Sequence, residues 1–163
     1  MFHIPENLHP NCGPVAWLLG TWGGRGHGDY PTIEPFSYGQ EIVFQQDGRP
    51  FLHYFARSWI LDEAGEKVRE AAQETGFLRC LEGGKLEFVL AHNTGFAEIW
   101  YGLAEGGKVE LRTAGVSFTE TAKEVVSGHR LYGNVEGDLL YAYDMEAMGQ
   151  EQQPHLWARL QRQ

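Results

Sequence analysis

Short turn signals recur along most of the chain, and they constrain its fold more than any other feature of the sequence. Glycine combined with Asp, Asn or Lys occurs at 47–48, 82–85, 93–95, 105–108 and 136–138. These positions separate segments rich in Val, Phe, Tyr, Trp and Leu, such as LEFVLAH and LLYAYDM. Gly, Asn and Asp supply the positive φ angles of tight hairpins, while β-branched and aromatic residues favour strands. Counted from Trp17, the pattern predicts about ten strands joined by short connections.

Ten sequential antiparallel strands with almost no helix would leave two unpaired sheet edges. Closing the sheet into an up-and-down barrel removes both edges, and a barrel of this size has room inside for one small ligand. A length of 163 residues suits one domain, and no Pro/Ser-rich linker or internal repeat divides the chain. The sequence therefore predicts an all-β fold: a single ten-stranded antiparallel up-and-down β-barrel domain over residues 1–163.

One short N-terminal helix is expected within NCGPVAWLLG, residues 11–20. Asn11 is its expected cap, Pro14 lies in its first turn, and Gly20 ends it.

The stretch GTWGGRGHG, residues 20–28, holds five glycines. It does not match a phosphate-binding loop, because no Lys-Ser/Thr pair follows the last glycine and the G-x-G-x-x-G spacing is absent. Nucleotide binding is therefore not predicted. We interpret the glycines as letting the first strand bend sharply and letting other backbone pack close to it, with Trp22 closing one end of the barrel.

The charge balance and the cysteine count narrow the class of protein further. A net charge of -9 argues against binding to a nucleic-acid backbone or an anionic membrane face. The sequence holds no apolar run that could span a bilayer and no segment like a signal peptide, so we expect a cytoplasmic protein. Cys12 and Cys80 are expected to be free thiols.

The seven histidines are the main candidates for chemistry, but their spacing is uninformative. None forms H-E-x-x-H or another metal-binding pair, and the chain lacks both C-x-x-C and G-x-S-x-G. His53 is expected to be hydrogen-bonded within the barrel wall, and His92 and His129 to be exposed. His155 differs, because Pro154 fixes the backbone before it and a terminal strand follows. From pattern alone, a lone histidine is more often structural than a ligand.

Several motifs, in order along nearly the whole chain, resemble those of the nitrobindin family. GTWGGRG at 20–26 fits the family's G-x-W-x-G-x-G motif. The other matching stretches are YPTIEPFSYGQE (30–41), ETGFLR (74–79), LAHNTGFAEI (90–99), AKEV (122–125) and GQEQQPHL (149–156). The resemblance implies a ten-stranded barrel shaped like fatty-acid-binding proteins. It also implies haem b in a pocket at the barrel mouth.

The resemblance also implies specific site residues. His155, in the Gln-Pro-x-His-Leu-type ending, corresponds to the proximal haem ligand and is thus the expected metal ligand. Thr32, in Tyr-Pro-Thr-Ile, corresponds to a haem-contacting position. Lys123 is a weaker candidate for a haem contact, and an exposed strand lysine is the alternative interpretation. Many relatives carry a histidine where this chain has Ala72, which affects the expected reactivity but not the axial ligand.

The function implied by the resemblance is isomerisation of peroxynitrite to nitrate at a ferric, His-ligated haem, with nitric oxide as a further ligand; a homodimer is left open. One alternative is a haem-free carrier of a fatty-acid-like apolar ligand, whose carboxylate Tyr54, Arg57 and Arg112 would hold. Another is haem sensing or transport without turnover. Apolar residues considered for the pocket wall are Phe44, Leu52, Val89 and Ile99.

The alternation of residues in the last strand conflicts with a pocket-facing His155. Leu156 and Ala158 form an apolar face, whereas His155 and Trp157 point to the other face. A strand sends alternate residues to opposite sides. His155 can therefore share the side of Leu156 only with a bulge or a late start of regular pairing; otherwise His155 and Trp157 both face the pocket.

Overall fold

Every strand of the protein is hydrogen-bonded to the next strand along the chain, and the last strand pairs with the first. The computed structural model describes residues 2–163. Its elements are η1 (Pro10–Leu18), β1 (Gly20–Tyr30), β2 (Ile33–Gln45), β3 (Phe51–Leu61), β4 (Lys67–Cys80), η2 (Glu82–Gly84), β5 (Lys85–His92), β6 (Phe96–Glu105), β7 (Lys108–Phe118), β8 (Val125–Val135), β9 (Asp138–Ala147) and β10 (Gln153–Arg162). The predicted closed barrel of ten antiparallel strands is confirmed.

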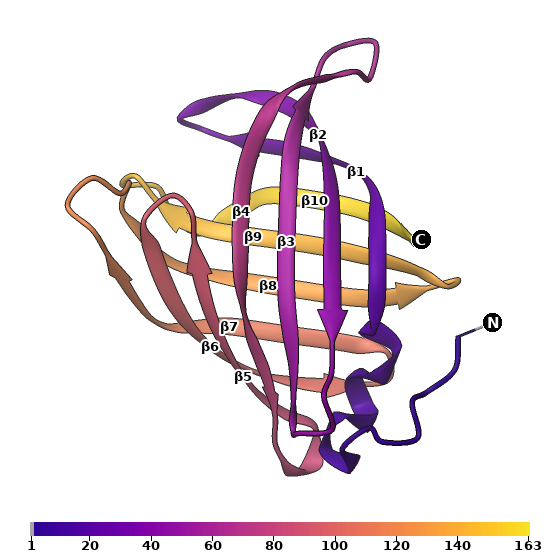
Figure 1. Ribbon diagram of the computed structural model, residues 1–163. Coiled ribbons are helices and arrows are strands. Elements are labelled where there is room, and N and C mark those ends of the chain that lie inside the picture. The colour runs from indigo at the N-terminus through magenta and orange to yellow at the C-terminus, as the bar shows by residue number, and fades with distance from the viewer. Residues whose placement is uncertain (1) are drawn as a thin grey trace.

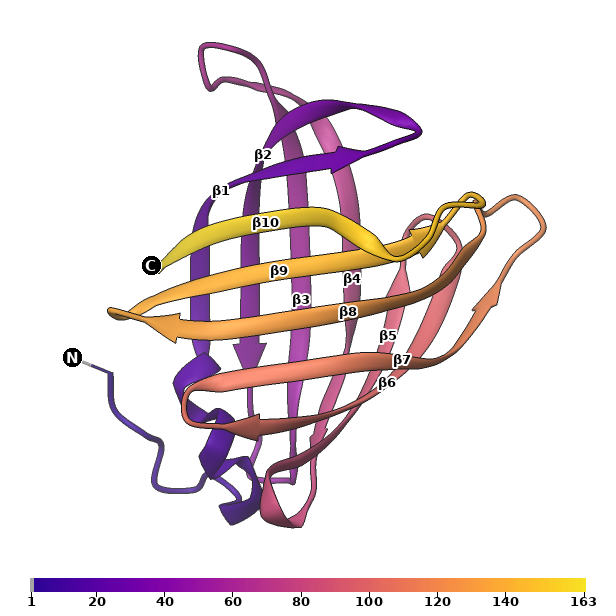
Figure 2. The same ribbon diagram turned by 180° about the vertical axis from the view of Figure 1, so that it is seen from behind.

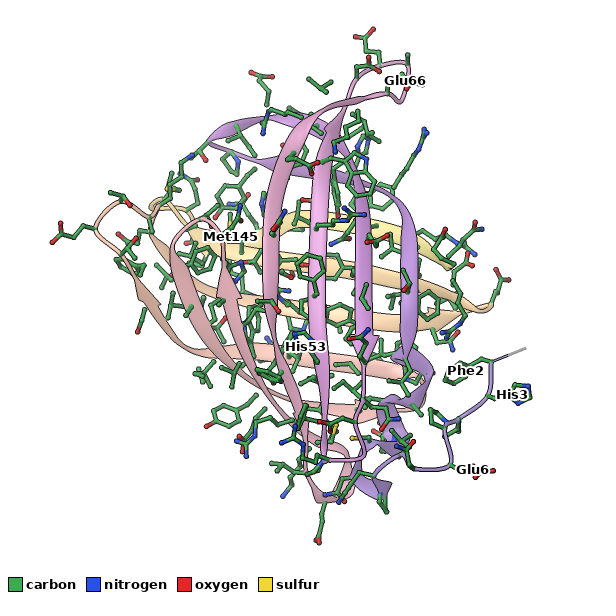
Figure 3. All side chains as sticks on the ribbon, viewed as in Figure 1. Phe2, His3, Glu6, His53, Glu66 and Met145 are labelled. Atoms are coloured by element: carbon green, nitrogen blue, oxygen red, sulfur yellow. The ribbon has the colours of Figure 1, made fainter. Side chains whose placement is uncertain are left out.

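The antiparallel order places alternate connections at opposite ends of the barrel. In Figure 1, β1–β4 run along one direction and β7–β10 run across it, so two parts of the wall face each other. We call the end that holds the β1–β2, β3–β4, β5–β6, β7–β8 and β9–β10 connections the open end. Glu66, in the β3–β4 connection, marks this end in Figure 3, whereas Phe2, His3 and Glu6 lie beside the opposite, closed end.

The 3₁₀ helix η1 covers the closed end. It spans Pro10–Leu18, and the ring Nδ1 of His9, not the side chain of Asn11, caps it by accepting a hydrogen bond from the Asn11 backbone N–H at 3.1 Å. The predicted helix therefore exists, but as a tighter 3₁₀ turn with a different cap. The indole Nε1–H of Trp22 donates to the Leu18 carbonyl at 2.7 Å, so Trp22 does close this end, as expected.

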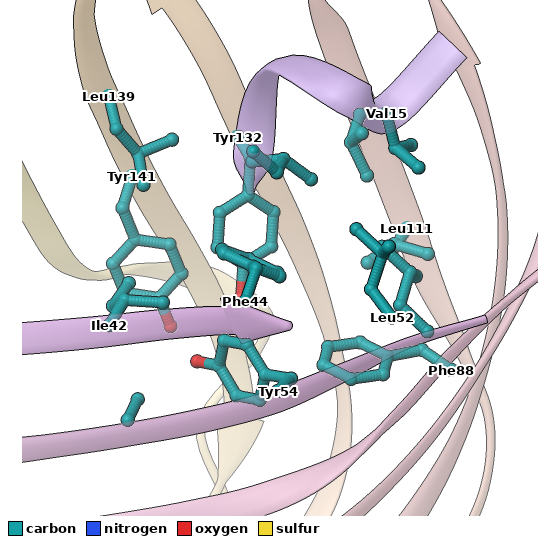
Figure 4. Close-up of a cluster of buried hydrophobic side chains, with 14 of the residues drawn as sticks. Val15, Ile42, Phe44, Leu52, Tyr54, Phe88, Leu111, Tyr132, Leu139 and Tyr141 are labelled. Atoms are coloured by element: carbon teal, nitrogen blue, oxygen red, sulfur yellow. The ribbon is translucent and has the colours of Figure 1, made fainter. Parts of the chain in front are cut away.

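Large apolar and aromatic side chains fill the closed half of the interior. Figure 4 shows Phe44, Leu52, Phe88 and Leu111 packed together beneath η1. Cys12 and Cys80 are free, buried thiols within the same cluster. Because Phe44 and Leu52 belong to this packed half, any ligand space must lie in the other half.

The glycine-rich strand β1 bends sharply, as Figure 2 shows. A Cβ added at Gly26 would lie 2.3 Å from the Trp157 carbonyl oxygen, and one at Gly24 would lie 2.3 Å from the Arg159 carbonyl oxygen. Only glycine permits so close an approach of β10. The interpretation of these glycines as a bend and a packing surface is confirmed.

Among the described residues, no helix is both long and apolar enough to cross a bilayer.

Candidate functional site

A cavity of about 500 Å³ occupies the open half of the barrel. Met145, labelled in Figure 3, belongs to its wall near the open end. A second chamber of about 420 Å³ adjoins it. The residues that line both are Ile33, Ala72, Glu74, Tyr141, His155 and Leu156. This size falls in the range of small-molecule sites, roughly 300–1,000 Å³.

The three residues singled out in the sequence all line the larger cavity. His155 comes from β10, Thr32 from the β1–β2 turn and Lys123 from the β7–β8 connection. Thr32 and Lys123 are exposed, at the rim, and Lys123 lies in a loop, not in a strand. Three segments distant in sequence thus meet at one site. Ala72 also lines both chambers.

A β-bulge resolves the conflict of strand alternation at His155. Pro154 pairs with Asp144 and Leu156 pairs with Tyr143, so two steps along β10 match one step along β9. His155 is the extra residue. A bulge of this kind re-aims a side chain, which lets His155 and Leu156 both line the cavity. Trp157 lies outside, with 58% of its surface exposed.

The position of the His155 ring is fixed by the backbone of β1. Gly28 and Leu156 form the last pair between β1 and β10 in the register, and Asp29 follows directly. The Asp29 carbonyl oxygen lies 3.0 Å from His155 Nδ1. A carbonyl can only accept, so Nδ1 carries the proton and Nε2 keeps a free lone pair.

Aromatic rings surround this imidazole. The ring centroids of Tyr30 and Tyr143 lie 5.4 and 5.9 Å from that of His155, both edge-on. Burial lowers the pKa of His155 below its usual value, although the hydrogen bond to the Asp29 carbonyl and the Asp29 charge partly oppose this. A neutral imidazole is the form that binds a metal ion.

A buried ion pair crosses the lumen at the inner end of the cavity. Arg130 of β8 donates from its two terminal nitrogens to the two carboxylate oxygens of Glu74 of β4, at 2.7 and 3.0 Å. Arg130 is only 1% exposed. Burial opposes ionisation of Glu74, but the Arg130 charge and its hydrogen bonds outweigh it, with help from His92 and Tyr54, and lower the pKa of Glu74 to about 2.

His92 extends this charged group and corrects the expectation that it is exposed. Its side chain is 8% exposed and lines the cavity. Its Nε2 lies 2.7 Å from a carboxylate oxygen of the buried Glu98, and its Nδ1 lies 3.3 Å from Glu74. His129 is also less exposed than expected, because it packs on β8 with its Nε2 2.8 Å from Glu110. His53 does hydrogen-bond within the wall, to Thr75 at 3.2 Å.

The carboxylate-holding set considered for a lipid carrier is not assembled. Arg57 pairs with Glu41 at 3.0 Å, and Arg112 contacts Glu110 with 67% of its side chain exposed. Tyr54 does face inward, where its hydroxyl donates to Glu74 at 2.5 Å. Val89 and Ile99 lie on the outer face of the barrel and line neither chamber.

Glu74 and Arg130 were not predicted as site residues, and His92 was predicted to be exposed. The motif ETGFLR contains Glu74 and LAHNTGFAEI contains His92, so both lay inside stretches already matched to relatives. Arg130 lies two residues before Tyr132 in β8, so the two side chains point to the same side of the strand, and this spacing was the available signal that Arg130 faces the interior.

The donor set fits an iron porphyrin better than a bare metal ion. In the described part of the chain, no group of three or more His, Cys, Asp or Glu side chains could hold a metal ion. His155 therefore offers one nitrogen only, and a metal bound there must bring its other ligands with it, as haem does. The apolar cavity wall suits the porphyrin, and Lys123 at the rim suits its carboxylates.

Fold and site together define a small β-barrel that binds a ligand in one open half of its interior, beside a single available imidazole. The chain belongs to the family described as THAP4-like, heme-binding beta-barrel domain, which matches residues 11–162. The resemblance to nitrobindins is thereby confirmed, and haem binding is the family's property.

Three relatives illustrate the family. A protein named peroxynitrite isomerase from a Nocardioides species is 74% identical over 162 residues, covering 99% of each chain. A ferric nitrobindin-like protein from Cutibacterium acnes is 39% identical and covers 99% of this chain and 98% of its own. The crystal structure of Rv2717c from M. tuberculosis superposes with a TM-score of 0.86 at 39% identity, over 96% of this chain and 99% of that chain.

Proposed function

We propose that this protein, as a single domain over residues 1–163, binds haem b through His155 and isomerises peroxynitrite to nitrate. The observation that carries the proposal is the hydrogen bond from His155 Nδ1–H to the Asp29 carbonyl, which leaves Nε2 free at the cavity wall. The 74% identity to a relative named peroxynitrite isomerase supports the reaction. Nitric oxide is proposed as a second ligand of the same haem.

Each residue has a defined part in this proposal. His155 would bind the iron through Nε2, and the Asp29 carbonyl keeps the proton on Nδ1 and holds the ring orientation. Thr32 and Lys123 lie exposed at the rim, where they would contact the edge of the porphyrin and where the Lys123 ammonium would attract its propionates. Tyr30 and Tyr143 pack against the imidazole and limit its movement.

When bound, haem would supply an iron centre able to bind an oxyanion, and the protein would tune that centre. Here the protein provides neutral imidazole ligation, a largely apolar wall and a rim that carries one lysine. Isomerisation of peroxynitrite consumes and releases no net proton, so the site requires no acid–base pair. His155 therefore serves to hold the cofactor.

Absorption spectroscopy with added haemin tests cofactor binding. The wild-type protein should give a Soret band, and His155→Ala should lose it. His53→Ala is the matched control, because His53 hydrogen-bonds to Thr75 in the wall and lines neither chamber. An unchanged band in His155→Ala would refute the assigned ligand.

Stopped-flow decay of peroxynitrite, with nitrate yield measured, tests turnover: equal yields with and without the haem-loaded protein would refute the isomerase.

A homodimer is the oligomeric state that we propose. Phe77, Val89 and Ile99 are register partners on β4, β5 and β6, and they are 46, 41 and 39% exposed on the outer wall. Adjacent apolar side chains of this kind suit a contact with a second copy. Light scattering should give twice the monomer mass, and Val89→Lys should return the monomer value.

A further inference from the structure

Three donors converge on one carboxylate inside the barrel. Two come from the guanidinium of Arg130, at 2.7 and 3.0 Å from the oxygens of Glu74. The third is the Tyr54 hydroxyl, at 2.5 Å. The ring Nδ1 of His92 lies 3.3 Å from the same carboxylate. A planar guanidinium with neighbouring hydroxyls is an effective receptor for a carboxylate. In this protein the carboxylate that occupies the receptor belongs to Glu74 of the same chain.

The receptor is built independently of Glu74. The guanidinium carbon of Arg130 lies 5.0 Å from the Trp100 ring centroid and 4.9 Å from that of Tyr143. The Tyr132 hydroxyl accepts a further hydrogen bond from Arg130 at 3.2 Å. These contacts hold the guanidinium in place from β6, β8 and β9, whereas Glu74 approaches from β4, on the far side of the lumen.

The site is continuous with the ligand cavity. The side chain of Glu74 is 13% exposed and lines both chambers. Its register partner on β3 is Ala56, a small residue that also lines the second chamber. Removal of the Glu74 side chain would thus join its volume to the cavity and present the guanidinium to any ligand inside.

We infer that Glu74 occupies a latent carboxylate-binding site, and that it determines specificity by keeping monocarboxylate ligands such as fatty acids out of the lumen. With Glu74 present, both terminal nitrogens of the buried Arg130 are paired with its carboxylate, and a second carboxylate would face Glu74 and the buried Glu98. An anionic ligand group is then directed to the rim. The inference concerns the protein without haem and does not depend on the proposed function.

Binding of sodium octanoate to the haem-free protein tests this inference, with sodium chloride at equal ionic strength as the reference. Thermal unfolding and titration calorimetry are measured for the wild type, for Glu74→Ala, and for the double variant Glu74→Ala/Arg130→Met. Octanoate should raise the melting temperature of Glu74→Ala and bind it at least tenfold more tightly than the wild type. The double variant keeps the enlarged cavity without the cation and should not respond.

Three results would overturn the inference. The first is a folded Glu74→Ala variant that does not respond to octanoate. The second is a double variant that binds octanoate as tightly as Glu74→Ala does, which would mean that the apolar cavity alone suffices. The third is a wild-type protein that binds octanoate as tightly as Glu74→Ala does. If Glu74→Ala is insoluble in chloride, it is refolded from urea with octanoate present. Recovery of folded protein supports the inference, and failure of that rescue refutes it. Haem binding, followed separately by absorption, decides the proposed function.

Discussion

The imidazole Nδ1 of His155 lies 3.0 Å from the main-chain carbonyl oxygen of Asp29, one residue past the last β1–β10 pair. A bulge in β10 turns the ring toward this carbonyl. The partner is a backbone atom, so the fold itself, and not another side chain, sets the tautomer. The free Nε2 at the cavity wall is thus a consequence of strand register.

This arrangement predicts how Asp29→Asn behaves. The carbonyl remains, so the Soret band should persist with haem affinity within about twofold. Removal of the Asp29 charge, which raises the pKa of His155, should lower that pKa further, while burial keeps it below 6.5 in both proteins. NMR titration of the haem-free proteins measures this. Because protons compete with iron for Nε2, haem affinity should fall only at a pH below the lowered pKa. A His155 pKa at or above 6.5 would contradict the account.

Structural features that are encoded by neighbouring residues could be predicted from the sequence, whereas contacts between distant strands could not. Hairpin turns and apolar strands are encoded by neighbouring residues, so the barrel and its ten strands followed from the sequence. The Arg130–Glu74 pair joins β8 to β4 across the lumen, with three strands between them in the barrel order. No local pattern encodes such a contact. His92 was misjudged for the same reason, since its partners become visible only when the barrel closes.

The bulge at His155 marks a different limit. Alternation in β10 showed that His155 and Leu156 could not share one face of a regular strand. A bulge was one of the solutions, but the choice depends on how β9 pairs with β10, and that register is a tertiary property. The helix cap was assigned to Asn11 because asparagine is a common N-cap and histidine is not. Only the hydrogen bond to the His9 ring identifies the cap.

A double-mutant cycle should reveal strong coupling between Arg130 and Glu74. Glu74→Gln and Arg130→Met each leave one buried charge unpaired, which typically costs about 3–5 kcal/mol of unfolding free energy. The double variant should cost far less than the sum of the two, because it leaves neither member of the pair as an unpaired buried charge. Urea unfolding measures each variant. The exposed pair Arg79–Glu87, at 2.7 Å, is the control and should couple by less than about 1 kcal/mol. Additive losses at Arg130 and Glu74 would contradict a tight pair.

Acid should lower the free energy of unfolding of the wild-type protein, because Glu74 becomes protonated. The pKa of Glu74 is about 2 in the folded protein and 4.5 without its partners, so the unfolded state takes up a proton first. The pair therefore contributes stability above about pH 4.5 that is lost as the pH falls toward 2, on the order of 3 kcal/mol. The Glu74→Gln/Arg130→Met variant should lose less stability over this window, as measured by urea unfolding at each pH. Identical acid profiles would exclude Glu74 as a source of the effect.

Gly26→Ala should destabilise the barrel, because its Cβ would lie 2.3 Å from the Trp157 carbonyl and 2.7 Å from the Tyr38 ring. Overpacking of this kind costs about 1–3 kcal/mol. Gly133→Ala is the matched control, since no atom lies within 4 Å of the added Cβ and the φ angle there is not positive. It should be neutral or stabilising by up to about 1 kcal/mol. Thermal unfolding compares the two, and equal melting temperatures would contradict the close approach of β10.

Lys123→Gln should weaken haem binding modestly and in a salt-dependent way. Lys123 is exposed at the rim of the cavity, where its ammonium can pair with a porphyrin propionate. An exposed ion pair contributes at most about 1 kcal/mol, so haem affinity should fall by no more than about fivefold at low salt. The loss should disappear near 1 M salt, where screening acts over only about 3 Å.

Lys108→Gln is the control, because it changes the net charge by the same amount at the closed end, beside Glu110 and away from the cavity. Haemin titrations followed at the Soret band distinguish the two variants. An equal loss in both would assign the effect to net charge, and a loss that persists at 1 M salt would show that Lys123 does not act through its charge.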